Sequence, residues 1–110
     1  MDERAKRIGL NEALFREVNE RVKGINDGFG TRLEEAEFVC ECGQEACTEQ
    51  IRLRMPDYEA LRADPTHFAV LPGHEIPDVE TVIARQDGYL IVEKHPGEPA
   101  ELAEETSPRA

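Results

Sequence analysis

The chain has 110 residues, of which 24 are acidic and 13 are basic, so its formal net charge is −11. This length predicts one domain, and the absence of tryptophan predicts a mainly aliphatic core. The acidic balance disfavours binding to nucleic-acid phosphates and to anionic membrane surfaces, and no run of Lys and Arg indicates a local basic patch.

The first predicted element is a long amphipathic helix. Residues 1–9 are charged and are predicted to be flexible. From residue 10, apolar residues recur every three or four positions until glycines near residues 24–28 end the helix. Such a stripe usually packs into a core, and the alternative is a helix that binds a partner. The residues of the stripe are Leu10, Leu14, Val18, Val22 and Ile25.

We favour association for this helix, because residues 37–94 are expected to form a sheet-based core without it. The helix is therefore predicted to pair with its copy in a homodimer or to dock on a partner protein.

A hairpin and a short helix are predicted next. Residues 29–36 are a predicted linker, in which Thr31 to Glu34 match a capping box that no apolar helical run follows. Strands are predicted at 37–40 and 50–55, around a short polar loop, because apolar and polar residues alternate in the second strand. A helix is predicted at 56–63, with a proline in its first turn and a stop before Pro65.

Three further strands are predicted at 67–71, 79–86 and 89–94. A Pro-Gly turn follows the first, and Asp87-Gly88 is a strong hairpin signal between the other two. Residues 96–110, rich in Glu, Ala and Pro, are predicted to be a disordered acidic tail. The predicted fold class is α+β, with a single domain over 10–95 that contains an antiparallel sheet of about five strands.

All three cysteines of the chain lie close together, as Cys40, Cys42 and Cys47 in the spacing C-x-C-x4-C. Thiolates are favoured ligands of zinc, which takes four ligands in a tetrahedron. Gly43 fits the turn that would bring the thiols together, because glycine tolerates positive φ. His74 is the predicted fourth ligand, since the Pro-Gly turn before it can direct it towards the hairpin tip. A Glu, an Asp or another histidine is the alternative.

Other interpretations of the cysteines stay open. Free cysteines also occur as small buried hydrophobes, and clustered thiols can carry redox chemistry. An odd number of cysteines fits reduced thiols or metal better than a disulfide framework. With neither a signal peptide nor a long apolar segment in the sequence, the protein is predicted to be cytoplasmic.

Several enzyme motifs are missing from the sequence: H-E-x-x-H, G-x-S-x-G, a phosphate-binding glycine-rich loop and C-x-x-C. Glu45, Glu49 and Glu75 could act as acid or base near a metal, but in so acidic a chain they are expected on the solvated surface. A closed site with four protein ligands would be structural, whereas an open fourth position would permit Lewis-acid chemistry.

The chain resembles a group of small uncharacterised bacterial proteins over about residues 10–95, and this resemblance implies no activity. The residues that carry it are Phe38-Val39-Cys40-Glu41-Cys42-Gly43, Cys47, Tyr58-Glu59, Arg62, Phe68, Pro72-Gly73-His74-Glu75 and Val92-Glu93-Lys94.

The function predicted from the sequence is a zinc-stabilised interaction or regulatory module without catalytic activity. The alternative is a thiol or metal-based redox sensor, and a small metal-dependent hydrolase comes third.

Overall fold

The computed structural model of the chain describes residues 1–28 and 34–109. The predicted α+β fold with a long N-terminal helix is confirmed. The capping box at Thr31 lies outside the described residues. The elements in chain order are α1 (Glu3–Gly28), β1 (Glu35–Val39), β2 (Gln50–Arg54), α2 (Met55–Arg62), β3 (His67–Val70), β4 (Glu80–Gln86), β5 (Tyr89–Lys94) and α3 (Glu98–Glu105).

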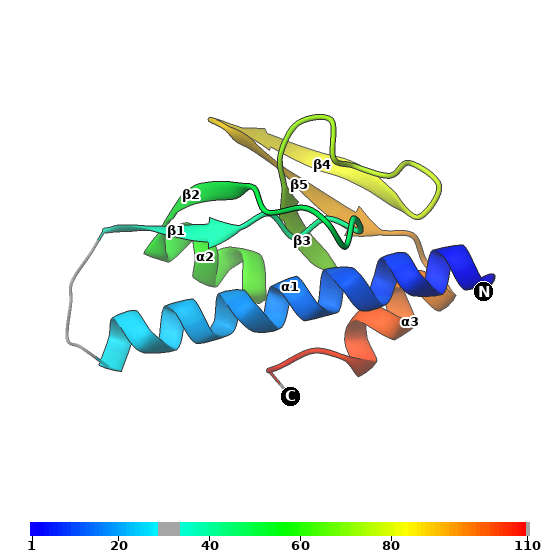
Figure 1. The fold of residues 1–110 in the computed structure, drawn as a ribbon, viewed down its shortest axis with the longest axis horizontal. Coiled ribbons are helices and arrows are strands. Elements are labelled where there is room, and N and C mark those ends of the chain that lie inside the picture. Colours follow the sequence, from blue (N-terminus) through cyan, green and yellow to red (C-terminus); the bar gives the residue numbers. More distant parts are fainter. Residues whose placement is uncertain (29–33, 110) are drawn as a thin grey trace.

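The predicted strands are present, but they form two small antiparallel sheets rather than one. One sheet pairs β1 with β2, and the other has the order β3-β5-β4. After β1 the chain leaves its ladder, and the Glu41 N–H donates to Ala69 O of β3 at 2.9 Å. In Figure 1, α1 runs along one side of both sheets, and α3 lies beside its N-terminal half.

The hydrophobic core has two adjoining parts. In the first, the rings of Phe38 and Tyr58 stack in parallel with their centroids 4.4 Å apart, between β1 and α2. The second part lies under the three-stranded sheet and includes two of the cysteines together with Phe68 and Val92. The cysteine segment is therefore part of the core and is not an appended loop.

Both ends of the described residues contain helical structure, where the sequence analysis expected flexible segments. At the N-terminus, the Asp2 carboxylate accepts a hydrogen bond from the Ala5 N–H at 2.7 Å, which is the typical N-cap interaction. Ile8, in the second turn of α1, is buried. Capping and burial together explain why α1 begins at Glu3 rather than near Leu10.

The predicted disordered tail contains helix α3. Arg16 of α1 donates to Ala103 O and to Thr106 Oγ1, each at 2.9 Å, and so binds the C-terminal end of α3. Beyond α3, Arg109 forms ion pairs with Glu20 and Glu59 at 2.7 and 2.6 Å. The sequence prediction failed here because these partners are distant in the chain.

Helix α1 buries its polar face and exposes most of its apolar stripe. Glu12, Arg16 and Asn19 are at most 1% exposed. Of the predicted stripe, only Val22 packs against the core. The others are exposed, at 46% for Leu10, 57% for Leu14, 37% for Val18 and 58% for Ile25. The interpretation of the stripe as ordinary core is therefore wrong.

The polar face of α1 is buried because each side chain meets a buried partner. Lys94 Nζ lies 2.6 Å from Glu12 Oε1 and 3.2 Å from Glu80 Oε1. Burial, reinforced by Glu80, raises the pKa of Glu12 well above its ordinary value. Asn19 exchanges two hydrogen bonds with the backbone of Val39 at the end of β1.

None of the helices within residues 1–28 and 34–109 is long and apolar enough to cross a membrane.

Lys94 should matter much more to stability than an exposed lysine in an ion pair. We expect Lys94→Met to lower the free energy of unfolding by roughly 3–5 kcal/mol, because two buried carboxylates lose their counter-charge. Lys23→Met is the matched control, since Lys23 also pairs with two carboxylates but nearer the surface; its cost should be about 1 kcal/mol or less. Denaturant unfolding measures both, and equal effects would contradict the expectation.

Deletion of residues 1–27 should also unfold the chain. The deletion removes Glu12 and Asn19 and leaves Lys94 and Glu41 buried without these partners. This expectation replaces the earlier one that residues 37–94 fold on their own, and circular dichroism of the truncated chain decides between them.

Candidate metal centre

The segment between β1 and β2 carries the three cysteines on a tightly held backbone. The Cys40 N–H donates to Glu49 O at 2.9 Å, which closes the base of the segment. The Cys47 N–H donates to Gln44 O at 3.0 Å and forms a turn at its far end. Cys40 and Cys42 are 1% and 0% exposed, and Cys47 is half-buried. All three are free thiols.

His74 reaches the cysteines from the connection between β3 and β4. The His74 N–H donates to Leu71 O at 2.9 Å, so the Pro-Gly pair forms a tight turn as predicted. Gly73 has a φ of 91°, a value that side-chain-bearing residues rarely adopt. The Glu75 carboxylate accepts the Gly73 N–H at 2.7 Å and closes the turn from the other side. The turn therefore holds the imidazole at a defined place.

The four predicted ligand residues converge, with one donor atom from each lying within 4.8 Å of all the others. His74 Nδ1 lies 3.7 Å from both Cys40 Sγ and Cys47 Sγ. A zinc tetrahedron with Zn–S bonds of about 2.3 Å and Zn–N bonds of about 2.0–2.1 Å has S···N edges of roughly 3.6 Å. The separations of His74 Nδ1 from Cys40 Sγ and from Cys47 Sγ match such a tetrahedron.

Backbone hydrogen bonds also favour the thiolate forms that a metal requires. The Leu71 N–H donates to Cys40 Sγ at 3.3 Å. Cys42 and Cys47 form hydrogen bonds with the backbone of Gln44 and Glu49, respectively, and these bonds favour the thiolate, although burial raises the pKa of Cys47 overall. Each sulfur therefore has a backbone partner, in the manner of a site built for negative charge.

The thiols influence one another in the metal-free chain. The hydrogen bond between Cys40 and Cys42 lowers the pKa of Cys42 to about 5 and raises the pKa of Cys40. For Cys47, desolvation by burial raises the pKa. Cys42 is thus the most acidic of the three thiols, and a bound cation would favour ionisation of the other two.

Glu41 lies between the first two cysteines, and its hydrogen bonds hold the cysteine segment against the rest of the protein. Its carboxylate is fully buried and accepts hydrogen bonds from Arg62 at 2.6 and 2.8 Å. It also accepts the side-chain amide of Asn19 at 2.8 Å and the Ala69 N–H at 3.1 Å. These contacts come from α1, α2 and β3. Sequence reasoning missed Glu41, and the only signal was its place between two predicted ligands, which directs it away from the metal.

Gly43 has a different role from the predicted one. Its φ is not among the positive values, which belong to Gly73, Gly88 and Gly97. A Cβ on Gly43 would lie 2.5 Å from Ile8 Cγ2, so the glycine permits close approach of α1. Asn11 of α1 also donates to Gly43 O at 3.0 Å. The absence of a side chain lets the helix pack directly on the cysteine segment.

The alternative ligands lie elsewhere in the structure. His67 Nε2 lies 2.9 Å from Glu93 and 3.4 Å from Asp64, on the surface of the three-stranded sheet. His95 Nε2 lies 3.1 Å from Thr81 Oγ1. Among the glutamates considered as acid or base, Glu45 and Glu49 are exposed. Within residues 1–28 and 34–109, the only grouping that includes the cysteines is Cys40, Cys42, Cys47 and His74.

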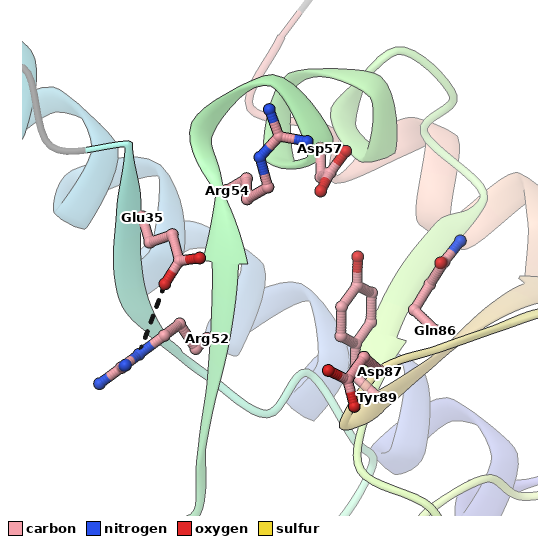
Figure 2. A pocket seen from close by; sticks show the side chains of 7 residues that line it. All are labelled: Glu35, Arg52, Arg54, Asp57, Gln86, Asp87 and Tyr89. Atoms are coloured by element: carbon pink, nitrogen blue, oxygen red, sulfur yellow. Dashed lines mark ion pairs between the residues drawn. The ribbon is translucent and has the colours of Figure 1, made fainter.

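A pocket separate from the cysteine cluster, of about 280 Å³, lies between the β2–α2 junction and the β4–β5 turn. Figure 2 shows Arg54 and Asp57 on one side of this space and Tyr89 with Asp87 on the other. Acidic and basic groups are mixed around it, and Arg52 lies 3.9 Å from Glu35. The lining shares no residue with the cluster: Glu35, Arg52, Arg54, Asp57, Gln86, Asp87 and Tyr89.

No family model matches the sequence, and no curated protein or solved structure gives a significant match. The resemblance to small bacterial proteins stays a prediction, and the functional argument therefore depends on the geometry of the site.

The contribution of His74 can be separated from that of the other histidines. We expect His74→Ala to weaken zinc binding more than about 10-fold, the lower limit for losing even a residue that only supports a ligand. His95→Ala is the control and should bind zinc like the wild type, because its ring contacts Thr81 instead. Competition with a chromogenic chelator measures both affinities, and unchanged binding by His74→Ala would remove this residue from the ligand set.

Proposed function

We propose that the protein is a small zinc-stabilised interaction module without catalytic activity. The observation that carries this proposal is the convergence of three Sγ atoms and one imidazole Nδ1 atom within 4.8 Å of one another. Three thiolates and one imidazole are a donor set typical of structural zinc sites, and soft thiolate donors disfavour magnesium and calcium.

A closed site supports the structural role over the hydrolytic one. Catalytic zinc sites keep one position for water or substrate. Here His74 Nδ1 would supply the fourth donor, and two of the three cysteines are buried from solvent. A hydrolase would need a ligand to leave before water could bind.

A bound zinc ion would stabilise the contact between the cysteine segment and the turn that carries His74. The site joins the segment after β1 to the turn after β3, and these parts belong to different sheets. The interior holds several buried charges, whose desolvation opposes folding. Because a preformed site does not exist in the unfolded chain, metal-binding energy becomes folding energy.

The proposed interaction surface is the exposed stripe of α1. Of the six exposed large hydrophobic side chains in the described residues, four lie on this helix, namely Leu10, Leu14, Val18 and Ile25. The net charge of −11 disfavours nucleic acid and anionic lipid as the partner, so we infer that the partner of this stripe is a protein. Free thiols also suit a reducing compartment such as the cytoplasm.

Elemental analysis tests the metal half of the proposal. Protein purified without chelator should carry about one zinc per chain, and removal of the zinc should lower the unfolding temperature markedly. Three freely titratable thiols, no bound metal and a chelator-insensitive unfolding temperature would overturn it.

A redox-sensor function is the second candidate, and the partial exposure of Cys47 favours it. Peroxide could reach this thiolate and convert it to a sulfenic acid. A neighbouring cysteine thiolate would then displace hydroxide and form a disulfide. Two thiolates lose two electrons in all, and one hydrogen peroxide takes up these electrons with two protons to give two waters. The loss of two donors would release the metal.

Mild peroxide distinguishes the two candidates. A structural site should retain its zinc under peroxide concentrations that oxidise a free low-pKa thiol, because a metal-bound sulfur in a closed core is shielded. Release of zinc, followed by its uptake after addition of a thiol reductant, would instead establish the sensor. A dye that reports free zinc follows both outcomes.

A further inference from the structure

The outward face of α1 carries a regular pattern of six side chains. They follow one another at intervals of three or four positions, so they lie on one side of the helix, and all six are exposed. In order along the chain they are Glu3, Arg7, Leu10, Leu14, Glu17 and Arg21. Two leucines are thus flanked on each side by one acidic and one basic residue.

The side chains of the four charged residues of this pattern form no ion pair or hydrogen bond within residues 1–28 and 34–109. Other charged residues of the same helix do: Arg4 pairs with Asp78 at 3.0 Å, Lys23 with Asp27 at 2.6 Å, and Glu20 with Arg109 at 2.7 Å. The outward charges of α1 are therefore free to meet an external surface.

The pattern is complementary to itself when the helix direction is reversed. Placing Leu10 of one copy opposite Leu14 of another puts Arg7 opposite Glu17 and Glu3 opposite Arg21. Each of these contacts occurs twice, as twofold symmetry requires. A parallel pair in register would instead set Arg7 against Arg7 and Glu17 against Glu17, which is repulsive.

We propose that the partner of α1 is a second copy of this chain, and that two copies associate through antiparallel α1 helices centred on Leu10 and Leu14. This inference depends on the proposed function and specifies the partner of the module. The overlap from Glu3 to Arg21 covers roughly 28 Å at 1.5 Å per residue.

The remaining exposed apolar residues find places in this arrangement. Val18 lies at the level of a depression of about 300 Å³ on the other copy, which is lined by Glu3, Lys6, Arg7, Leu10 and Asn11. Ile25 reaches the end that carries Met1, which is itself 46% exposed. An interface of one helix from each copy lies near the lower limit for stable association, about 1,200 Å² in total, so the dimer should dissociate on dilution.

Charge reversal tests the register directly. Glu17→Arg places Arg7 against a second arginine, and Arg7→Glu places Glu17 against a second glutamate. Each variant alone should weaken self-association at least about 10-fold, because both symmetric pairs become repulsive. An equimolar mixture of the two variants should associate again, because every pair between a Glu17→Arg chain and an Arg7→Glu chain is attractive.

The measurement is sedimentation equilibrium of the zinc-loaded full chain, with Arg85→Glu as the control. Arg85 is exposed on β4, and its reversal changes the net charge by as much as Arg7→Glu without touching α1. The control should associate like the wild type. Wild-type protein that stays monomeric, single variants that associate normally, or a mixture that stays monomeric would each overturn the proposal.

Zinc content, measured on the same samples, separates this inference from the metal site. A zinc-loaded wild-type monomer would refute the dimer and leave the metal site standing. A zinc-free dimer with the predicted charge dependence would refute the zinc site and support the dimer.

Discussion

The buried ion pair between Glu41 and Arg62 is the interaction on which the rest of the structure depends. Glu41 lies between two of the cysteines, and its carboxylate binds groups from α1, α2 and β3. An ionised carboxylate in a protein interior is costly unless its hydrogen bonds are satisfied, so these elements are held in place around it. The cysteine segment consequently has one position relative to the helices, and this position directs the sulfurs towards His74.

The same requirement explains why α1 is turned with its polar side inwards. Asn19 donates a hydrogen bond to Glu41, and Glu12 accepts one from Lys94. Arg16 donates to the Ala103 carbonyl group near the end of α3. A helix that satisfies buried charges with one face cannot bury its leucines with that face. The apolar stripe is left outside, where it is available to another protein.

Most of the candidate site could be derived from the sequence, because its determinants are local. Three cysteines within one short segment restrict their own separations, and a Pro-Gly turn restricts the orientation of the next residue. Only convergence between the two segments required the fold, and Glu41 is the residue that sets it. Its partners Asn19 and Arg62 lie 22 and 21 positions away in the chain, so no local pattern could reveal them.

The sequence by itself determined the fold class, the positions of the strands and the set of donor side chains, since alternation, turn residues and cysteine spacing act over a few positions. Only the tertiary structure decided that the strands form two sheets, that the tail contains a helix and that Gly43 serves packing rather than a turn. It also decided which face of α1 lies inside. Periodicity shows that a helix has two unlike faces, but burial follows the partners available to each face, and here buried charges required the polar one.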